Sequence, residues 1–464
     1  MLFLEKYRNL FAIIASVFLY FFFAYFLERT QFYTVSFLWI SLFGCFYILI
    51  KNKNISFYTL VGIAIIFRLI FLFSTPNLSQ DFYRFIWDGR MLLNGFNPYL
   101  SLPETFIQQN LQPIADAASL YNGMGELNGS HYTNYPPLNQ LCFFIAALFA
   151  SKSIFGSVIV LRTLIILADL GILYFGKKLL ERLNLPTRNI FWYVLNPFII
   201  IEMTGNLHFE PVMLFFLVWA LYKLQQQKWI WAAILIACSV AVKLIPLLFL
   251  PLFFQWFTKI PESNKKNDKM KWFGFKIQPK KIIKFITFNL IIIGTSIVLF
   301  LPFYSSELVA NYSNSVGLWF RNFEFNASFY YIFREIGYLF RGYNEIAIIG
   351  KISPILTILF LIYLTFFRKN KSITQLTTAM LFGLSFYYFT ATTVHPWYVA
   401  TPLILCVFTK YKFPVVWSLV IILTYQAYAN NPWKENLWFV FIEYFILFSF
   451  LIYELLLFKK IKKL

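Results

Sequence analysis

Apolar runs of about 20 residues recur from one end of the chain to the other, separated by short polar connectors. A helix needs a run of that length to cross the hydrocarbon core of a bilayer. The pattern predicts an all-α polytopic membrane protein, a transmembrane helical bundle built from about 13 to 15 apolar segments. The expected helices cover residues 10–27, 33–50, 56–73, 156–175, 189–203, 210–224, 229–243, 245–257, 284–301, 345–366, 375–391, 398–409, 414–428 and 437–458.

The composition agrees with this membrane class. Hydrophobic residues make up 59% and charged residues 13% of the 464 residues, whereas soluble domains carry about 25% charged residues. The net charge is +20, from 40 Lys and Arg against 20 Asp and Glu. These basic residues cluster in short loops between apolar runs, as the positive-inside rule describes. The charge therefore indicates a lipid bilayer as partner and no nucleic acid.

The basic loops also predict which side of the membrane each connector occupies. The segments MLFLEKYRN and KNKN are expected to be cytoplasmic, which leaves residues 74–137 outside. Counting membrane crossings back from the basic C-terminus gives the same sides only if one apolar segment between residues 138 and 175 does not cross the membrane. The 14-residue run 138–151 is the expected exception, which re-enters or lies at the interface.

This topology gathers the unusual polar groups on one side. That side holds the loop 74–137, the turn 205–210, Lys243, the loop 302–344 and the turn 394–398. All three histidines of the chain lie in these segments. We therefore expect a multi-pass membrane protein whose active site faces away from the cytoplasm.

We expect the whole chain, 1–464, to form a single transmembrane domain. The first apolar run lacks a small-residue cleavage site, so it is expected to be a retained helix within an extra N-terminal pair at 1–55. Residues 74–137 form a large non-cytoplasmic catalytic loop with amphipathic helices. Residues 258–283 form a basic cytoplasmic connector.

The stretch from Ser79 to Tyr99, SQDFYRFIWDGRMLLNGFNPY, lies between two long apolar regions. Read as a helix, it places Asp81, Arg84 and Asp88 on one face. Ser79 can cap its start, and turn signals follow its end. We expect a short amphipathic helix on the membrane surface that presents these groups to water. The alternative is a helix that only anchors a loop, with ordinary solvated charges.

Asp81 is the first candidate for chemistry. Its loop directly follows a helix exit, so the carboxylate is expected near the membrane surface, where it can take a proton from an acceptor hydroxyl. The alternative is an aspartate that only caps the helix.

His208 and Glu210 form a second candidate site. A glutamate at a helix start is favoured by the helix dipole, but polar groups this close to the hydrocarbon are usually functional. The pair can bind a sugar, orient a base or ligate a metal. A divalent metal is possible, but no third ligand stands at a diagnostic spacing, so no cofactor is expected.

Five cations on the same side could together hold a phosphate. They are Arg84, Arg90, Lys243, Arg321 and His395. Lys243 could instead extend its ammonium group to the membrane surface.

Aromatic and polar side chains on that side could bind a sugar or an acceptor. The tryptophans and tyrosines could equally form an ordinary belt at the membrane interface. The residues expected to contact the sugar or acceptor are Trp87, Asp88, His208, Glu210, Trp397 and Tyr398.

The motifs, taken in order, resemble those of the bacterial GT-C superfamily glycosyltransferases. The similarity is greatest to the polyprenyl-phosphate-mannose-dependent mannosyltransferases related to glycosyltransferase family 87, and it covers most of residues 75–400. The first motif matches at Asp81, Tyr83, Arg84, Trp87, Asp88, Gly89, Arg90, Gly95, Asn97, Pro98 and Tyr99. The later motifs are Tyr135-Pro136-Pro137, Asn196-Pro197, Gly205 to Glu210, Lys243 to Pro246 and His395 to Tyr398.

This resemblance implies a GT-C-type bundle in the bacterial inner (cytoplasmic) membrane, with the active site facing the periplasm or exterior. It also implies an inverting sugar transfer, with Asp81 as general base. The donor would be a polyprenyl-phosphate sugar, with mannose as the sugar. The acceptor would be a hydroxyl of a lipid, a glycan or a protein. Two features depart from the family pattern: the first motif follows the third apolar run instead of the first, and Glu210 stands where many relatives have aspartate.

Two other functions are considered beside glycosyl transfer. A lipid-linked oligosaccharide flippase or transporter would carry charges within several spanning helices and usually an internal repeat, and neither is evident. An O-antigen-type polymerase would share the basic external loop but not the ordered series of motifs.

Overall fold

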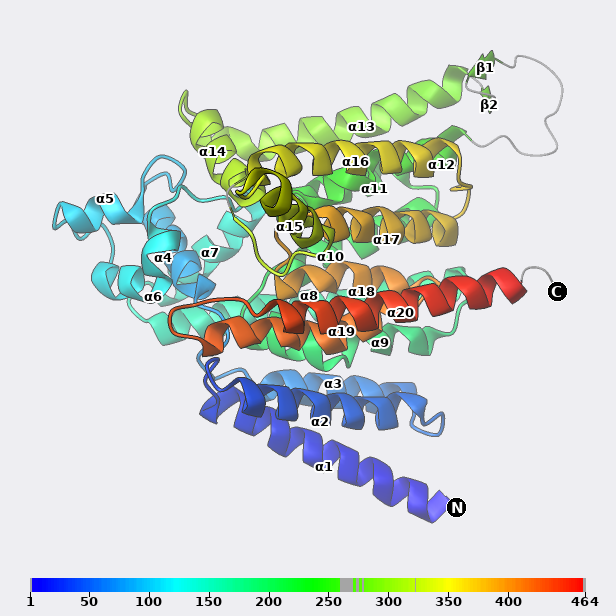
Figure 1. Ribbon diagram of the computed structural model, residues 1–464, viewed down its shortest axis with the longest axis horizontal. Coiled ribbons are helices and arrows are strands. Elements are labelled where there is room, and N and C mark those ends of the chain that lie inside the picture. The colour runs from blue at the N-terminus through cyan, green and yellow to red at the C-terminus, as the bar shows by residue number, and fades with distance from the viewer. Residues whose placement is uncertain (1, 259–269, 273–274, 278, 322, 462–464) are drawn as a thin grey trace.

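The computed structural model describes residues 2–258, 270–272, 275–277, 279–321 and 323–461. Helices are the dominant structure of these residues (Figure 1), which confirms the expected all-α class. Apart from turns and loops, the described residues contain two strands of three residues each.

Nearly all the expected helices are present, with ends that differ by a few residues. The first half contains α1 (Leu2–Phe26), α2 (Phe32–Lys51), α3 (Phe57–Ile70), α4 (Asp81–Leu93), α5 (Pro103–Gln108), α6 (Ala117–Gly129), α7 (Pro137–Ala150), α8 (Ile154–Arg182), η1 (Thr187–Ile190), α9 (Phe191–Val194), the π-helix η2 (Ile199–Gly205), α10 (Glu210–Gln225), α11 (Trp229–Val240), η3 (Ile245–Phe253) and α12 (Phe254–Thr258). The second half contains β1 (Met270–Trp272), β2 (Phe275–Ile277), α13 (Pro279–Phe300), η4 (Leu301–Phe303), α14 (Leu308–Arg321), α15 (Phe329–Arg341), α16 (Ile346–Phe366), α17 (Ile373–Thr390), η5 (Pro396–Val399), α18 (Ala400–Val407), α19 (Phe413–Val420), η6 (Ile421–Ala429) and α20 (Leu437–Ile461).

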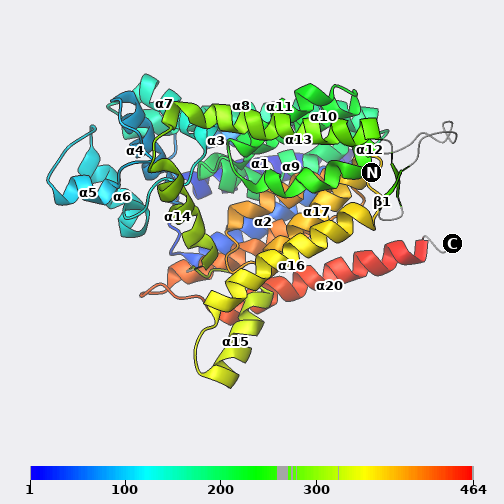
Figure 2. The ribbon, with the colours of Figure 1, turned by 90° about the horizontal axis from the view of Figure 1, so that it is seen from above.

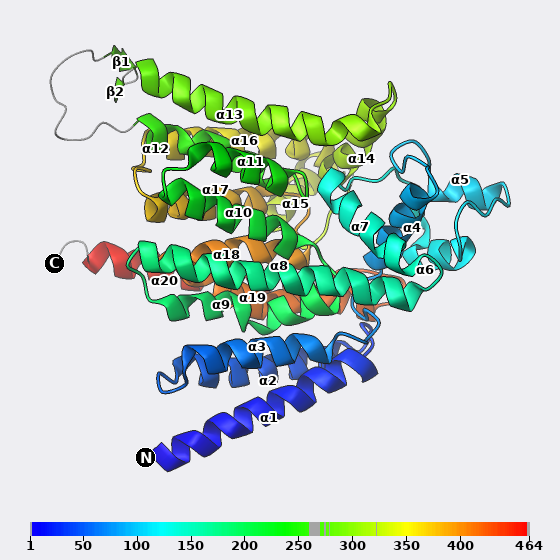
Figure 3. The same cartoon turned by 180° about the vertical axis from the view of Figure 1, so that it is seen from behind.

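The long helices lie side by side in a bundle, with both chain ends at the same end of it (Figures 1 and 3). The opposite end, called here the loop end, carries α4 to α7 and α14. Within the described residues, six helices are long and apolar enough to cross a membrane. The pair η2 and α10, bent by 112°, has the length and composition of a broken span or a re-entrant loop. The six are Tyr7–Phe26, Phe32–Lys51, Ile154–Arg182, Lys280–Phe303, Ile346–Phe366 and Leu437–Lys460.

Helix α7 lies at the loop end and does not run the length of the bundle (Figure 3). Its start is tied to the end of α11, because the Leu138 amide donates to the Ala241 carbonyl at 2.9 Å. Its end is tied to the start of α8, because the Ser157 hydroxyl donates to the Ala150 carbonyl at 3.0 Å. The end of α3 and the start of α8 therefore both lie at the loop end of the bundle (Figure 3).

The two N-terminal helices pack as part of the bundle. The Trp39 indole of α2 donates to the Leu419 carbonyl of α19 at 2.9 Å. In the connection between α1 and α2, Arg29 donates to the Gln80 side chain at 3.0 Å and lies over the ring of Tyr428. The N-terminal pair thus reaches the residue just before α4.

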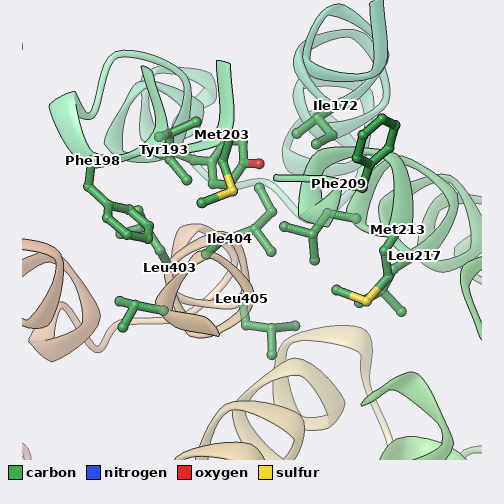
Figure 4. Packing of buried hydrophobic residues seen from close by; sticks show 14 of the residues in the cluster. Ile172, Tyr193, Phe198, Met203, Phe209, Met213, Leu217, Leu403, Ile404 and Leu405 are labelled. Atoms are coloured by element: carbon green, nitrogen blue, oxygen red, sulfur yellow. The ribbon is translucent and has the colours of Figure 1, made fainter. Parts of the chain in front are cut away.

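The apolar core surrounds the break between η2 and α10. Figure 4 shows Met203, Phe209 and Met213 on one side and Leu403 to Leu405 of α18 on the other. All of these side chains are almost completely buried. Packing on both sides of the break fixes the turn 206–209, so this turn is held as firmly as the helices that it joins.

The predicted basic connector 258–283 lies mostly outside the described residues. Its described part forms the antiparallel pair β1 and β2, in which Met270 is opposite Ile277. This hairpin lies at the same end of the bundle as the two termini (Figure 1).

Helix α15 projects from the side of the bundle (Figure 2). Its apolar side chains at the helical spacing of one face are exposed, most of all Leu339 and Phe340 at 82% and 84%. The opposite face is attached to the bundle, because Tyr330 and Tyr331 are buried.

Candidate active site

A cavity of about 260 Å³ lies where the polar segments of the loop end meet. Its walls come from residues 81–85, 127–139, 208–209, 243–245, 316, 350–354 and 387–398. Segments far apart in the sequence therefore converge on one space, as the gathering of polar groups predicts.

Helix α4 is buried, so the prediction of a water-facing amphipathic helix is wrong. Arg84, Asp88 and Arg90 are only 4%, 0% and 2% exposed. The reason is that α6 and α7 pack on the polar side of α4 and satisfy its charges internally. The polar face predicted from the spacing exists, but it faces protein.

The position of α4 is set by close contact with α7. A Cβ atom at Gly89 would lie 2.1 Å from the Phe143 carbonyl oxygen, so only glycine permits this approach. Phe85 stacks on Phe143 with ring centroids 4.6 Å apart, and Phe209 packs edge-on against both rings. The three rings join α4, α7 and the turn before α10.

Asp81 is the first residue of α4 and lines the cavity. The Ser79 hydroxyl accepts from the Asp81 amide at 3.3 Å, and the Asn128 amide donates to the Asp81 carboxylate at 3.4 Å. Burial raises the pKa of Asp81 above its ordinary value, and the Lys243 cation partly opposes this rise. A half-buried carboxylate with a raised pKa and one long hydrogen bond is suited to accept a proton.

Lys243 and Glu210 form an ion pair in the cavity wall. Glu210 begins α10 and is buried, and Lys243 follows α11 with its side chain 20% exposed. The second carboxylate oxygen of Glu210, Oε2, has no hydrogen-bond partner among the described residues. The pair explains how a lysine is held within an apolar stretch, and it leaves the ammonium group at the cavity.

His208, Trp397 and His395 form a stack of three rings. The ring of Trp397 lies 4.0 Å from that of His208 and 4.5 Å from that of His395, with interplanar angles of 20° and 4°. Both faces of Trp397 are thus covered by imidazoles, so a bound sugar could reach only its edge. Burial lowers the pKa of His395 to about 3, so this ring is neutral at pH 7.

Arg84 and Asp88 brace the wall of the cavity. Arg84 donates to Asp88 at 2.8 Å and to the carbonyls of Asn128 and His131 at 2.5 and 2.9 Å. The other oxygen of Asp88 accepts from Gln140 at 2.9 Å. Asp88 is therefore saturated by protein groups, whereas Arg84 also lines the cavity.

Three other predicted site residues do not line the cavity or have side chains outside the described part of the chain. Arg90 donates to the Ala115 carbonyl and to Asp116, at 2.6 and 3.0 Å. Trp87 is buried beside Phe106. Neither contributes to the cavity wall. The side chain of Arg321, the last residue of α14, lies outside the described part of the chain.

Tyr398 lines the cavity and stacks on Tyr388, with ring centroids 5.5 Å apart. Asn139 also lines it and was not predicted. Asn139 is fully buried, and neither atom of its amide has a hydrogen-bond partner among the described residues. The sequence feature that could have pointed to Asn139 is its position just after the Tyr135-Pro136-Pro137 motif, in the first turn of the helix that begins there.

No three His, Cys, Asp or Glu side chains in the described ranges are close enough to hold a metal ion together.

Comparison with known families adds one match. A family model described as alpha-(1->6)-mannopyranosyltransferase, N-terminal domain, of the MptA/B family, matches residues 22–259, about half of the chain. The protein belongs to this family. It is a membrane α-mannosyltransferase, which confirms the GT-C and family 87-like resemblance. A search of curated proteins returns no match.

The matched part of this mannosyltransferase contains Asp81, the turn at His208 and Glu210, and Lys243. His395 and Trp397 lie beyond it and are brought to the same cavity by α17 and η5. The cavity is thus completed by the part of the chain that the family model does not cover.

Proposed function

We propose that the protein transfers mannose from a polyprenyl-phosphate donor to a hydroxyl acceptor, with inversion at the anomeric carbon, on the non-cytoplasmic side of the membrane. The observation that carries this proposal is a single cavity that holds both the Asp81 carboxylate and the Lys243 ammonium group. A transfer from a phosphate donor needs a base for the nucleophile and a cation for the leaving group.

The reaction is one displacement. The acceptor oxygen forms a bond to the anomeric carbon while the bond from that carbon to the phosphate oxygen breaks. The hydroxyl proton passes to Asp81, and the polyprenyl phosphate leaves with the bonding electrons. Lys243 and Arg84 are the permanent cations proposed to stabilise that phosphate.

Two further predicted phosphate ligands, His395 and Arg90, differ in their position relative to the cavity. His395 lines the cavity and can contribute a hydrogen bond. Arg90 is engaged by Ala115 and Asp116, so it is expected to organise the loop instead of binding the donor.

The linkage in the family description supports a proposal for the acceptor. An alpha-(1->6) product means that a mannose is added to a primary hydroxyl at carbon 6. A mannosylated lipid or glycan with a free 6-hydroxyl is therefore the proposed acceptor. We propose the periplasmic or exterior side because the basic segments lie at the end of the bundle opposite the cavity.

The test uses purified protein in lipid nanodiscs with polyprenyl-phosphate [¹⁴C]mannose and a short α-mannoside acceptor. The expected result is radiolabelled, extended acceptor together with free polyprenyl phosphate. GDP-mannose in place of the lipid donor should give no product. Transfer from GDP-mannose alone would overturn the donor assignment. Movement of the intact donor across the membrane without transfer would favour a flippase.

A further inference from the structure

Glu202 is a buried carboxylate that neither the sequence motifs nor the reaction above uses. It lies in the π-helix η2, is 0% exposed, and stands just before the break that leads to α10. A carboxylate within an apolar span is costly unless its partners offset the loss of water. Single π-turns inside helices frequently occur at functional sites.

Two groups face the oxygens of this carboxylate. The Tyr425 hydroxyl donates to Glu202 Oε1 at 2.5 Å. Glu202 Oε2 lies 3.7 Å from His208 Nε2, within ion-pair distance. Neither Oε2 nor Nε2 has a hydrogen-bond partner in the described part of the chain, and the 3.7 Å between them is longer than a hydrogen bond. The carboxylate oxygen and the ring nitrogen are therefore two neighbouring unsatisfied polar atoms, and a hydrogen bond between them would satisfy both.

The ring of His208 has little freedom to turn away from Glu202. One face is covered by Trp397, whose other face is covered by His395. His208 nevertheless lines the cavity, although its Nε2 is buried. The Nδ1 edge is therefore the one that can reach a bound molecule.

We propose that Glu202 holds His208 in the tautomer with the proton on Nε2, so that Nδ1 accepts a hydrogen bond from a hydroxyl of the bound mannose. In this assignment His208 binds the sugar, while Glu202 and Tyr425 are positioning residues. A neutral histidine has one donor nitrogen and one acceptor nitrogen, and the hydrogen bond at one sets the role of the other. The choice of mannose rests on the proposed function.

The first test reads the tautomer directly and does not depend on activity. The chain has three histidines, so ¹⁵N-histidine labelling with single substitutions of His131 and His395 assigns the signals of His208. The expected spectrum shows a neutral ring with the proton on Nε2. Glu202→Met should produce a tautomer mixture, and Glu202→Gln, which keeps an acceptor, should largely restore the wild-type state.

Glu443→Gln is the matched control, because Glu443 is also a fully buried glutamate of the bundle. It should leave the His208 signals unchanged. A ring protonated on both nitrogens, or on Nδ1, would overturn the proposal. So would His208 signals that are the same in wild type and in folded Glu202→Met.

The second test identifies what Nδ1 contacts. Polyprenyl-phosphate mannose should shift the Nδ1 resonance of His208, whereas polyprenyl phosphate alone should not. In transfer assays, His208→Asn places an amide near Nδ1 and should change the KM less than threefold. His208→Gln, which imitates Nε2, should raise the KM at least tenfold with a smaller effect on kcat.

The reverse order of these two variants, or a shift caused equally by polyprenyl phosphate, would refute sugar recognition by Nδ1. If no mannosyl donor supports transfer, the proposed function fails, and the tautomer spectra still decide the role of Glu202.

Discussion

Glu210 binds Lys243 through one carboxylate oxygen in the wall of the cavity that also contains Asp81. This relationship separates the two carboxylates by role. The Lys243 ammonium group occupies one oxygen of Glu210, so that oxygen is not available to take a proton from an acceptor hydroxyl. Among the described residues, the Asp81 carboxylate receives one long side-chain hydrogen bond, from Asn128. Asp81 is therefore the better general base, and Glu210 serves to hold Lys243.

Asp81→Asn should lower kcat by about 10² to 10⁴, the usual contribution of a general base. Because the shape of the side chain is kept, donor binding should change little. Turnover and donor affinity measured on the same preparation check this. Glu210→Gln is the rival variant: near-normal turnover in Asp81→Asn with a large loss in Glu210→Gln would move the base to the turn before α10.

The pH dependence of transfer should report the environment of Asp81. Burial raises its pKa, so the carboxylate is protonated at low pH and the rate rises as pH increases through that raised pKa. The Lys243 cation opposes the rise, so Lys243→Met should move the acid limb to higher pH. Profiles of kcat/KM against pH measure this.

Lys228→Met, on the exposed connector between α10 and α11, is the matched control for this shift. It should leave the acid limb in place. An unchanged limb in Lys243→Met, with activity retained, would contradict the electrostatic link between the two residues.

Lys243 and Arg90 should differ in what they support. Lys243→Met is expected to raise the donor KM about tenfold, since a cation on a bound phosphate contributes about 1.5–3 kcal/mol. Arg90→Met should instead lower the melting temperature, because Ala115 and Asp116 lose their partner, with the donor KM nearly unchanged. Thermal unfolding and donor titrations distinguish the two, and a large KM effect for Arg90 would restore it as a phosphate ligand.

Gly89→Ala should destabilise the protein by about 1–3 kcal/mol, the usual cost of overpacking. The added methyl would meet the Phe143 carbonyl and separate α4 from α7. Gly44→Ala is the matched control, because nothing lies within 4 Å of its Cβ position in α2. There the change should be neutral or stabilising by about 0.5–1 kcal/mol. Equal thermal stability of the two variants would show that the contact between α4 and α7 is loose.

Residues at the loop end should react with a labelling reagent added outside intact cells. Cysteines introduced at the exposed positions Ser130 and Ser313 are expected to react with an impermeant maleimide, whereas a cysteine at Lys53 should react only after lysis. The reason is the asymmetry of the basic loops. The reverse pattern would place the cavity on the cytoplasmic side.

The sequence by itself determined the helices, the membrane class and the gathering of polar segments at one end. Apolar runs of membrane length leave the backbone little choice but helix, because peptide groups in lipid must bond within their own segment. The basic loops also indicated that 138–151 re-enters or lies at the interface, which stays a prediction, and α7 lies at the loop end (Figure 3). The ordered motifs from Asp81 to Tyr398 were sufficient to identify the family resemblance.

Only the tertiary structure decided which polar groups face the cavity. Helical spacing shows that Asp81, Arg84 and Asp88 share a face, but it contains no information on what packs against that face. Whether a charge meets water, another side chain or an open cavity depends on segments distant in the chain. For the same reason the sequence did not reveal that Asn139 lines the cavity, that Trp397 is covered on both faces, or that Glu202 lies beside His208. Those contacts exist only because long-range packing brings α7, η2 and η5 together.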